Sequence, residues 1–376
     1  MRKKKVFAIV LTMVLMMSQV SVAKSNSVGY GKKTVTINNQ KKTVNVVTVD
    51  LNNTNIQLGV TIANDKIGGH EDFSNMIKRK KPIAAINANY FDAYKTLEPM
   101  GAIMIDNKFQ YLEGSPASMI VTDDGKVQIG QYNMGINGYI NGFRENNWNN
   151  ETQSMDYNLF KIWYVNNVPK DSTGAYIYTP ARGSKIDLNG GIAIEVIKDK
   201  VTKVTKNAKQ ASIPKNGYVI YYGNTKSFEN YVDQRFKVGD KIELEYEILE
   251  AKENAQKKQE ELKEIKQNNI KSIISAGPYL VENGKSIYDP NKNGFKEDKI
   301  TKNRGQRSAI GITKNNKLLL VTGSNLNMKE LSQIMVKLGA DRAMNLDGGA
   351  SSALYANGKT ITPAGRKLHT VLMVYE

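Results

Sequence analysis

The 376-residue chain carries 53 Lys and Arg residues against 36 Asp and Glu residues, and it contains no cysteine. Its 40% hydrophobic and 24% charged residues are typical of globular proteins and exclude a disordered chain. A disulfide scaffold, a cysteine nucleophile and a thiolate zinc site are excluded, and the two histidines, His70 and His369, cannot build a polyhistidine metal site. Any bound metal would need oxygen ligands, as Ca2+ does.

The formal net charge of +17 favours anionic partners such as phosphate-bearing polymers, membranes or nucleic acid. The lysines are scattered and no nucleic-acid-binding motif is present, so we expect no nucleic acid partner. A phosphate-containing wall polymer is the partner that an exported protein of this charge would meet. A lysine-rich surface that only keeps the protein soluble is the simpler alternative.

The first 23 residues have the layout of a secretory signal peptide. A basic head, Arg2–Lys5, precedes an apolar run, Val6–Met17, and the small residues Ser21-Val22-Ala23 follow. A membrane anchor is the alternative, which the shortness of the apolar run disfavours. We therefore expect cleavage after Ala23 and an extracellular or cell-wall-associated protein with no integral membrane span.

Strand patterns dominate the first 250 residues. The polar residues 24–33 predict a flexible leader, and strands are predicted at Val44–Val49 and at Ile56–Ile62, where apolar residues alternate with others. Between about residues 100 and 250, short apolar stretches alternate with turn signals, as is typical of antiparallel sheet. The turn signals are Asp124-Gly125, Asn137-Gly138, Asn189-Gly190 and Lys215-Asn216-Gly217.

Two segments have helical patterns. Residues 251–267 are rich in Lys and Glu with a thin apolar stripe, which predicts a solvated helix inserted at the surface. From Met328 to Leu338, apolar residues recur at helical spacing and Gly339 is placed to end the helix. Strands are predicted on both sides of it, at Lys317–Val321 and Ala343–Leu346. The sequence thus predicts an α+β fold, a mixed and mostly antiparallel sheet with few packed helices, in one large domain from residue 34 to 376.

The strongest chemical signal is the run Met344–Ser352, which reads Met-Asn-Leu-Asp-Gly-Gly-Ala-Ser-Ser. Glycines allow backbone amides to approach a ligand, and the hydroxyls of Ser351 and Ser352 suit phosphate oxygens. Asp347 offers a carboxylate for proton transfer or for a metal ion. A tight hairpin with an Asp-Gly turn explains the same pattern equally well.

Three other segments carry polar or aromatic side chains at the ends of apolar runs. Ile86–Asp92 contains two amides and two aromatic rings, a combination that sugar recognition uses, although a strand end with a capping Asn is as good an explanation. Arg307 stands at the entrance of an apolar strand, where a guanidinium could grip a phosphate, and an exposed basic loop is the alternative. Ser275–Val281 could be purely structural, and Arg366 and His369 are weaker signals.

In combination, four motifs resemble the phosphodiester glycosidase family: Asn-Ala-Asn-Tyr-Phe-Asp, Gly-Pro-Tyr-Leu-Val, Arg-Ser-Ala-Ile-Gly and Asn-Leu-Asp-Gly-Gly-Ala-Ser-Ser. This family includes the lysosomal uncovering enzyme, which removes N-acetylglucosamine from a phosphodiester on mannose. The resemblance extends from about Val44 to the C-terminus, and the last motif is the specific one. The chain departs from the family pattern at Gly323, where an acid is common, and at Ala350, where a third glycine is usual. The first departure leaves the division of catalytic roles open.

The resemblance implies a secreted hydrolase that cleaves a sugar from a sugar-1-phosphodiester on a bacterial surface or extracellular glycopolymer. It places Asp347, Arg307 and Asn345 among the catalytic residues, with Asp347 as the acid/base or a calcium ligand. Glu98 and Asp92 are the candidates for a second carboxylate. No cofactor is certain, and Ca2+ is the candidate. The implied substrate-binding residues are Asn87, Asn89, Tyr90, Phe91, Gly277, Pro278, Ser308, Gly348, Gly349, Ser351, Ser352 and Arg366.

Two other functions fit the same motifs. A non-catalytic protein that binds wall polymer or exopolysaccharide would need the arginine and the glycine-rich turn but no carboxylate poised for proton transfer. A phosphodiesterase would cut on the other side of the phosphate.

The leader predicts that the mature protein begins at Lys24. N-terminal sequencing of protein recovered from the medium or the cell wall should give Lys24 or a close neighbour as the first residue. Soluble cytosolic protein that keeps Met1 would contradict export.

Overall fold

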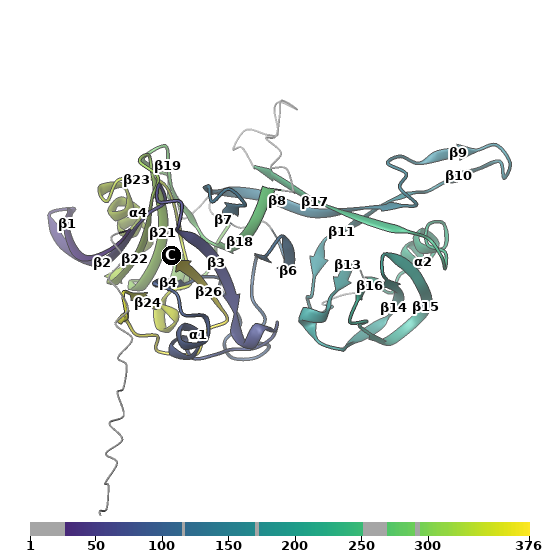
Figure 1. Ribbon diagram of the computed structural model, residues 1–376, viewed down its shortest axis with the longest axis horizontal. Helices are drawn as coiled ribbons and strands as arrows, with labels where there is room; N and C mark the ends of the chain where they lie inside the picture. Colours follow the sequence, from purple (N-terminus) through teal and green to yellow (C-terminus); the bar gives the residue numbers. More distant parts are fainter. Residues whose placement is uncertain (1–26, 115–116, 170–172, 251–268, 290–293) are drawn as a thin grey trace, which may run out of the picture.

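The computed structural model describes residues 27–114, 117–169, 173–250, 269–289 and 294–376. The predicted signal peptide and the predicted charged helix at 251–267 lie outside these residues. The described chain forms two lobes (Figure 1). One lobe contains the first and last parts of the chain, the other contains its middle, and the long strands β8 (Val127–Ile140) and β17 (Ile242–Glu250) extend from one toward the other.

A seven-stranded antiparallel sheet forms one layer of the first lobe. Its order is β1-β2-β22-β21-β23-β19-β20. The strands are β1 (Val28–Ile37), β2 (Gln40–Asp50), β22 (Lys317–Leu326), β21 (Gly305–Thr313), β23 (Ala340–Asn345), β19 (Tyr279–Glu282) and β20 (Lys285–Ser286). Helix α4 (Met328–Lys337) packs on this sheet through Leu331, Ile334 and Met335, which are all fully buried.

A five-stranded antiparallel sheet forms the second layer, in the order β25-β24-β4-β26-β3. The strands are β25 (Lys359–Thr362), β24 (Leu354–Ala356), β4 (Ala84–Asn87), β26 (Thr370–Tyr375) and β3 (Gln57–Ile62). Helix α1 (Phe73–Lys80) covers its outer face through Phe73 and Met76. The inner faces of the two sheets share one apolar core, to which Ile310 and Ile86 both belong.

A twelve-stranded sheet reaches from the first lobe into the second. Its main path is β11-β8-β7-β18-β5-β6-β12-β13-β16-β14-β15, with β17 paired to β8, and the β12–β13 pair is its one parallel pairing among the described residues. The strands are β5 (Ala102–Ile105), β6 (Lys108–Leu112), β7 (Ala117–Thr122), β11 (Leu159–Ile162), β12 (Tyr164–Val165), β13 (Ala175–Tyr178), β14 (Lys185–Ile197), β15 (Lys200–Ser212), β16 (Gly217–Tyr222) and β18 (Ile270–Ala276). The remaining elements are the projecting hairpin β9 (Asn147–Asn149) and β10 (Ser154–Asp156), helices α2 (Lys226–Asp233) and α3 (Asp298–Thr301), and three short 3-10 turns at Ala63–Asp65, Pro180–Arg182 and Gly349–Ser351.

The predicted α+β class, with mostly antiparallel sheet and few helices, is confirmed. Helix α4 covers the predicted segment, and its first turn is closed by a capping box in which Asn327 accepts from the amide of Glu330 and the Glu330 carboxylate accepts in return. Gly339 follows the helix with φ +88°, a conformation that glycine adopts without strain.

Two of the predicted turns are wrong. Asn137-Gly138 lies inside β8, where Gly138 is required because the ring of Phe160 packs directly across its backbone. Asn189-Gly190 lies inside β14, where Gly190 (φ +84°) allows the register shift of a β-bulge. The predicted flexible leader, 24–33, also differs from the structure, because β1 begins at Val28 and pairs with β2 along its whole length.

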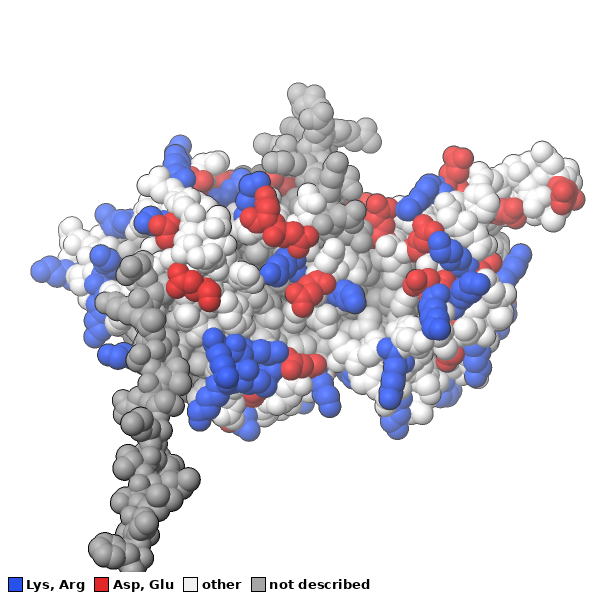
Figure 2. Space-filling model, in the orientation of Figure 1, with Lys and Arg blue, Asp and Glu red and all other residues white. Residues whose placement is uncertain are grey.

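Among the described residues, no helix is long and apolar enough to cross a membrane. On the face drawn in Figure 2, Lys and Arg side chains occur over both lobes and are interspersed with acidic ones.

The packing of Gly138 generates a stability prediction with a control in the same strand. Gly138→Ala should lower the free energy of unfolding by about 1–3 kcal/mol, because the new Cβ would overlap the buried Phe160 ring. Gly135→Ala, whose Cβ would meet nothing closer than 3.9 Å, should change it by less than about 1 kcal/mol. Urea titrations followed by circular dichroism measure both, and equal losses would show that the ring contact does not require glycine.

Candidate active site

The site is organised around the side-chain amide of Asn87, at the end of β4. Its Nδ2 donates to the backbone carbonyl of Asp347 (2.7 Å). Its Oδ1 accepts from Ser308 Oγ (2.8 Å) and from the backbone amide of Ala353 (2.9 Å). Asn87 and Ser308 are both buried. These two predicted substrate-binding residues therefore fix the position of the turn that follows β23.

Glycine is needed at two positions of this turn, for a different structural reason at each. A Cβ on Gly348 would lie 2.9 Å from the carbonyl oxygen of Gln306, so only glycine allows the turn to pack this closely against the start of β21. Gly349 has φ +60°, which favours glycine for conformational reasons. Ala350, which stands where the family usually has a third glycine, is exposed, and its carbonyl accepts from the amide of Gly365 (2.8 Å).

The Asp347 carboxyl lies at the base of this turn with part of its surface still open to solvent. Burial among neighbouring atoms raises the pKa of Asp347 to about 6, although hydrogen bonds from Ser351 and from the Gly348 amide (2.9 Å) act in the opposite direction. A carboxyl with this pKa exchanges its proton near neutral pH, as a general acid or base must.

A second hydrogen-bonded group forms the wall beside Asp347. Asn345 Nδ2 donates to Tyr90 Oη (2.6 Å) and to the carbonyls of Gly277 (2.8 Å) and Leu346 (2.6 Å), and Tyr90 Oη donates to the Gly277 carbonyl (2.7 Å). The backbone of Asn345 also bonds to Gly277 and Pro278. Burial raises the pKa of Tyr90, and the charge of Asp347 raises it further, so the phenol stays protonated. All four of these sequence-predicted residues meet here.

Arg307 lies near Tyr90 and is 6% exposed. Its Nε donates to the carbonyl of Leu326 (3.1 Å), and its Nη2 donates to those of Lys299 (2.9 Å) and Asn303 (2.6 Å). Within the described residues no carboxylate pairs with it, and burial lowers its pKa. The guanidinium thus donates to three backbone carbonyls, and only Nη1 is left to donate to a ligand. A bidentate interaction with a phosphate would require one of these bonds to break.

Two further cations act on Asp347. The charges of Arg366 and Lys299 both lower its pKa, which places them near the carboxyl. Arg366 was expected from the sequence, and its Nη2 donates to Tyr94 Oη (2.8 Å). Lys299 was missed, because it lies in the short helix α3 among ordinary surface charges and carries no motif.

The remaining predicted residues have mainly structural contacts. Asn89 is buried and donates to the carbonyls of Met100 and Ala102. Ser352 is buried, and within the described chain its Oγ has no hydrogen-bond partner. Phe91 lies beside the buried ring of His369, with 6.4 Å between ring centroids.

His369 and the two weaker carboxylate candidates are also held by the fold. Burial lowers the pKa of His369 to about 3, so its ring is neutral at physiological pH. Glu98 pairs with Arg182 (2.5 Å). Asp92 accepts hydrogen bonds from the loop that follows it, and these lower its pKa. Both carboxylates are therefore engaged with other partners.

The sequence also makes Asp347 a candidate calcium ligand. In the described part of the chain, no group of three or more Asp, Glu or His side chains is arranged to hold a metal ion. The geometry at Asp347 therefore gives no support to a protein-ligated Ca2+ site.

Comparison with known proteins shows what the chain is similar to. A family model described as phosphodiester glycosidase matches residues 191–375. An uncharacterized protein of Rickettsia conorii is 24% identical over 279 residues, which are 72% of this chain and 87% of that protein.

Two solved structures share the fold. A hypothetical protein from Synechocystis has a TM-score of 0.73 at 20% identity, over 93% of this chain and 62% of that one. A putative exported protein from Burkholderia pseudomallei has a TM-score of 0.66 at 16% identity, over 89% and 74% of the two chains. This chain thus spans less than two thirds of the Synechocystis protein.

The matched segment includes β21 with Arg307, the turn with Asp347 and the loop with Arg366. The resemblance noted in the sequence is confirmed by this match, in which residues 191–375 of the chain fit the phosphodiester glycosidase family model.

Proposed function

We propose that this protein is a hydrolase that releases a sugar from a sugar-1-phosphodiester, with Asp347 as its general base. The observation that carries the proposal is the Asp347 carboxyl, whose pKa is raised to about 6 while two cations and a buried guanidinium lie around it. A carboxyl that served only to shape a turn would gain nothing from a pKa this close to neutrality.

The reaction needs one proton transfer and one displacement. Asp347 in its ionised form takes a proton from a water molecule, and the water oxygen forms a bond to the anomeric carbon. The bond between that carbon and the phosphate oxygen breaks, and its electron pair leaves with the phosphate monoester. The charge that develops on the leaving oxygen is stabilised by nearby cations, for which Arg366, Lys299 and Nη1 of Arg307 are the candidates.

A single carboxylate is sufficient for this chemistry. Ordinary glycosidases use a second carboxylic acid to protonate an alcohol as it leaves. A phosphate monoester is a much weaker base than an alkoxide, so it leaves without that proton. This agrees with the structure, in which the Asp92 and Glu98 carboxylates already bond to other groups of the protein.

We further propose that the substrate is a surface or extracellular glycopolymer and that the protein acts outside the cytoplasm. The support is the positive net charge, which attracts phosphate-bearing polymers, and the signal-peptide layout of the first 23 residues.

The position of bond cleavage tests the proposed reaction directly. The mature protein should release free sugar and a phosphate monoester from a sugar-1-phosphate methyl diester, and hydrolysis in 18O-water should place the label on the sugar. Label on the phosphate would instead identify a phosphodiesterase. No product from any sugar phosphodiester, combined with measurable polymer affinity, would favour the binding protein.

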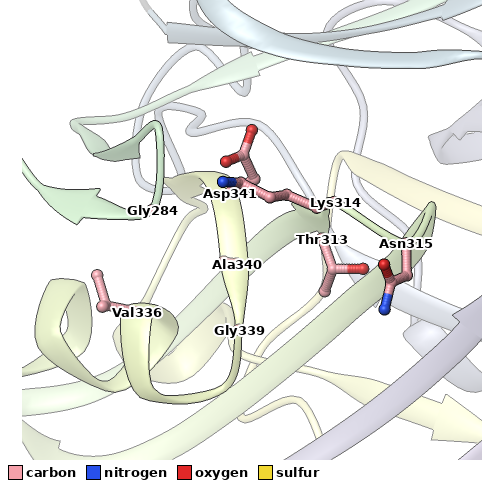
Figure 3. A pocket seen from close by; sticks show the side chains of 8 residues that line it. All are labelled: Gly284, Thr313, Lys314, Asn315, Val336, Gly339, Ala340 and Asp341. Carbon is pink, nitrogen blue, oxygen red and sulfur yellow. The ribbon is translucent and has the colours of Figure 1, made fainter.

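Removing the charge of Asp347 should strongly reduce turnover with little change in substrate binding. Asp347→Asn should lower kcat by about two orders of magnitude or more, because an amide cannot accept the proton of water. Asp341→Asn is the matched control. Asp341 lies at the other end of β23, where it lines a separate cavity of about 370 Å3 (Figure 3). Full turnover by folded Asp347→Asn would remove this residue from the mechanism.

The pH profile follows from the same group. As a base, Asp347 works when ionised, so kcat/KM should rise about tenfold per pH unit up to about pH 6 and then level off. A profile that falls through pH 6 would mean that Asp347 acts as an acid.

The raised pKa also predicts that the catalytic carboxyl destabilises the fold. The folded protein holds the Asp347 proton more tightly than the unfolded chain, so this contribution to stability is present below pH 3.8 and is lost as the pH rises to about 6. At pH 8, Asp347→Asn should therefore be more stable than the wild type by about 1–2 kcal/mol, with allowance for the solvent-facing part of the carboxyl. The difference should vanish near pH 4. Denaturation at both pH values measures it, and equal stability at pH 8 would contradict the raised pKa.

A further inference from the structure

An exposed aromatic ring stands at the edge of the candidate active site. Tyr94 is 83% exposed. Among the described residues, no other large hydrophobic side chain is more exposed. Its hydroxyl accepts the hydrogen bond from Arg366 Nη2 (2.8 Å), and the guanidinium carbon is 5.1 Å from the ring centroid. Arg366 follows Gly365, whose amide bonds to the carbonyl of Ala350 in the turn after Asp347 (2.8 Å), so the ring lies beside the loop that contacts this turn.

The loop that carries Tyr94 is held in one conformation by Asp92. Oδ1 of Asp92 accepts from the amides of Tyr94 and Lys95, and Oδ2 accepts from the amide and the hydroxyl of Thr96, each at 3.1 Å. A carboxylate with four hydrogen bonds fixes the loop, so the ring is presented to solvent without the entropy loss of ordering it on binding. The fold thus presents one aromatic face in a fixed position, where a sugar ring can stack on it.

A cavity adjoins the ring through Arg366. Its volume is about 620 Å3, and its lining includes the cations Arg366 and Lys367, the hydroxyl-bearing residues Ser74 and Thr360, and one acid, Asp72. The loop that carries the two cations is tied to the catalytic turn by the bond from the Gly365 amide to the Ala350 carbonyl (2.8 Å). The cavity therefore keeps a fixed position relative to Asp347.

We propose that Tyr94, Arg366 and this cavity form a subsite for the sugar on the leaving-group side of the phosphodiester. A pyranose ring stacks on the face of Tyr94, and Arg366 and Lys367 bind anionic groups of the same chain. This assignment rests on the proposed function and specifies its substrate: a phosphodiester between two sugars, the second of which continues into a longer polymer.

We assign the Tyr94 subsite to the leaving-group sugar because the site is open to solvent at Tyr94. Tyr90 and the buried Asn345 and Arg307 form the wall beside Asp347, and this less exposed part suits a single terminal sugar. A polymer must leave the site through a part that is open to solvent, and the ring of Tyr94 is there. Stacking on a rigid, exposed aromatic ring contributes enough to change an affinity about tenfold.

The test compares two substrates that differ only in the leaving group. One is a sugar-1-phosphate methyl diester, and the other carries a hexose in place of the methyl group. Tyr94→Ala should reduce the ratio of kcat/KM for the hexose substrate to that for the methyl substrate about tenfold. Tyr94→Phe, which keeps the ring, should keep the ratio within about twofold of wild type. Tyr30→Ala removes an exposed tyrosine on β1 and should leave both values unchanged.

Binding to the inactive variant separates this proposal from the proposed function. The affinity of Asp347→Asn for the hexose substrate, measured by calorimetry, should fall about tenfold when Tyr94→Ala is added. If neither substrate is hydrolysed but this loss of affinity is found, the subsite stands and the proposed hydrolysis is wrong. If turnover is found and the substrate ratio of Tyr94→Ala equals that of wild type, the subsite is overturned.

Discussion

The side chain of Asn87 determines where the turn that carries Asp347 lies. One amide joins β4 of the five-stranded sheet to β21 of the seven-stranded sheet, through Ser308, and to both ends of the turn, at Asp347 and Ala353. Each of these groups is buried or nearly so, and an unpaired partner would cost about 1–3 kcal/mol. The position of the Asp347 carboxyl therefore depends on a residue 260 positions earlier in the chain, which itself has no need to contact a ligand.

Around this fixed turn, the fold places groups that differ in how freely they exchange protons. The Tyr90 hydroxyl and the His369 ring are held in their neutral forms by burial, while Asp347 is buried enough to raise its pKa and open enough to meet water. Arg307 keeps its charge next to this group and uses it on backbone carbonyls. The result is one exchangeable proton in surroundings that are otherwise fixed in charge, which suits a reaction with a single proton transfer.

Much of this arrangement could be predicted from the sequence. Strands β2 and β3, helix α4 and the antiparallel character of the middle of the chain follow from apolar spacing and turn residues. The four motifs do meet, because each follows or precedes an apolar strand of the same two-layered core.

The errors have physical causes that a single sequence does not contain. The pair Asn137-Gly138 is typical of a turn, but glycine is needed at 138 because the ring of Phe160, on another strand, packs against it. In the same way, nothing local shows that Asn87 and Asn89 complete the hydrogen bonding of buried loops. Lys299 carries no pattern at all, because its importance arises only from where α3 lies.

The strand order of the five-stranded sheet affects how the protein reaches its folded state. Strand β4 lies between β24 and β26, so a strand near residue 85 has as both its neighbours strands from beyond residue 350. Contacts this distant in sequence require large loops to close before they stabilise anything, and folding that depends on them is slow. Until the last part of the chain is available, both edges of β4 are unpaired and can associate with other chains. A protein with this topology would benefit from a chaperone that covers these edges after synthesis, and its yield on refolding should fall steeply with protein concentration.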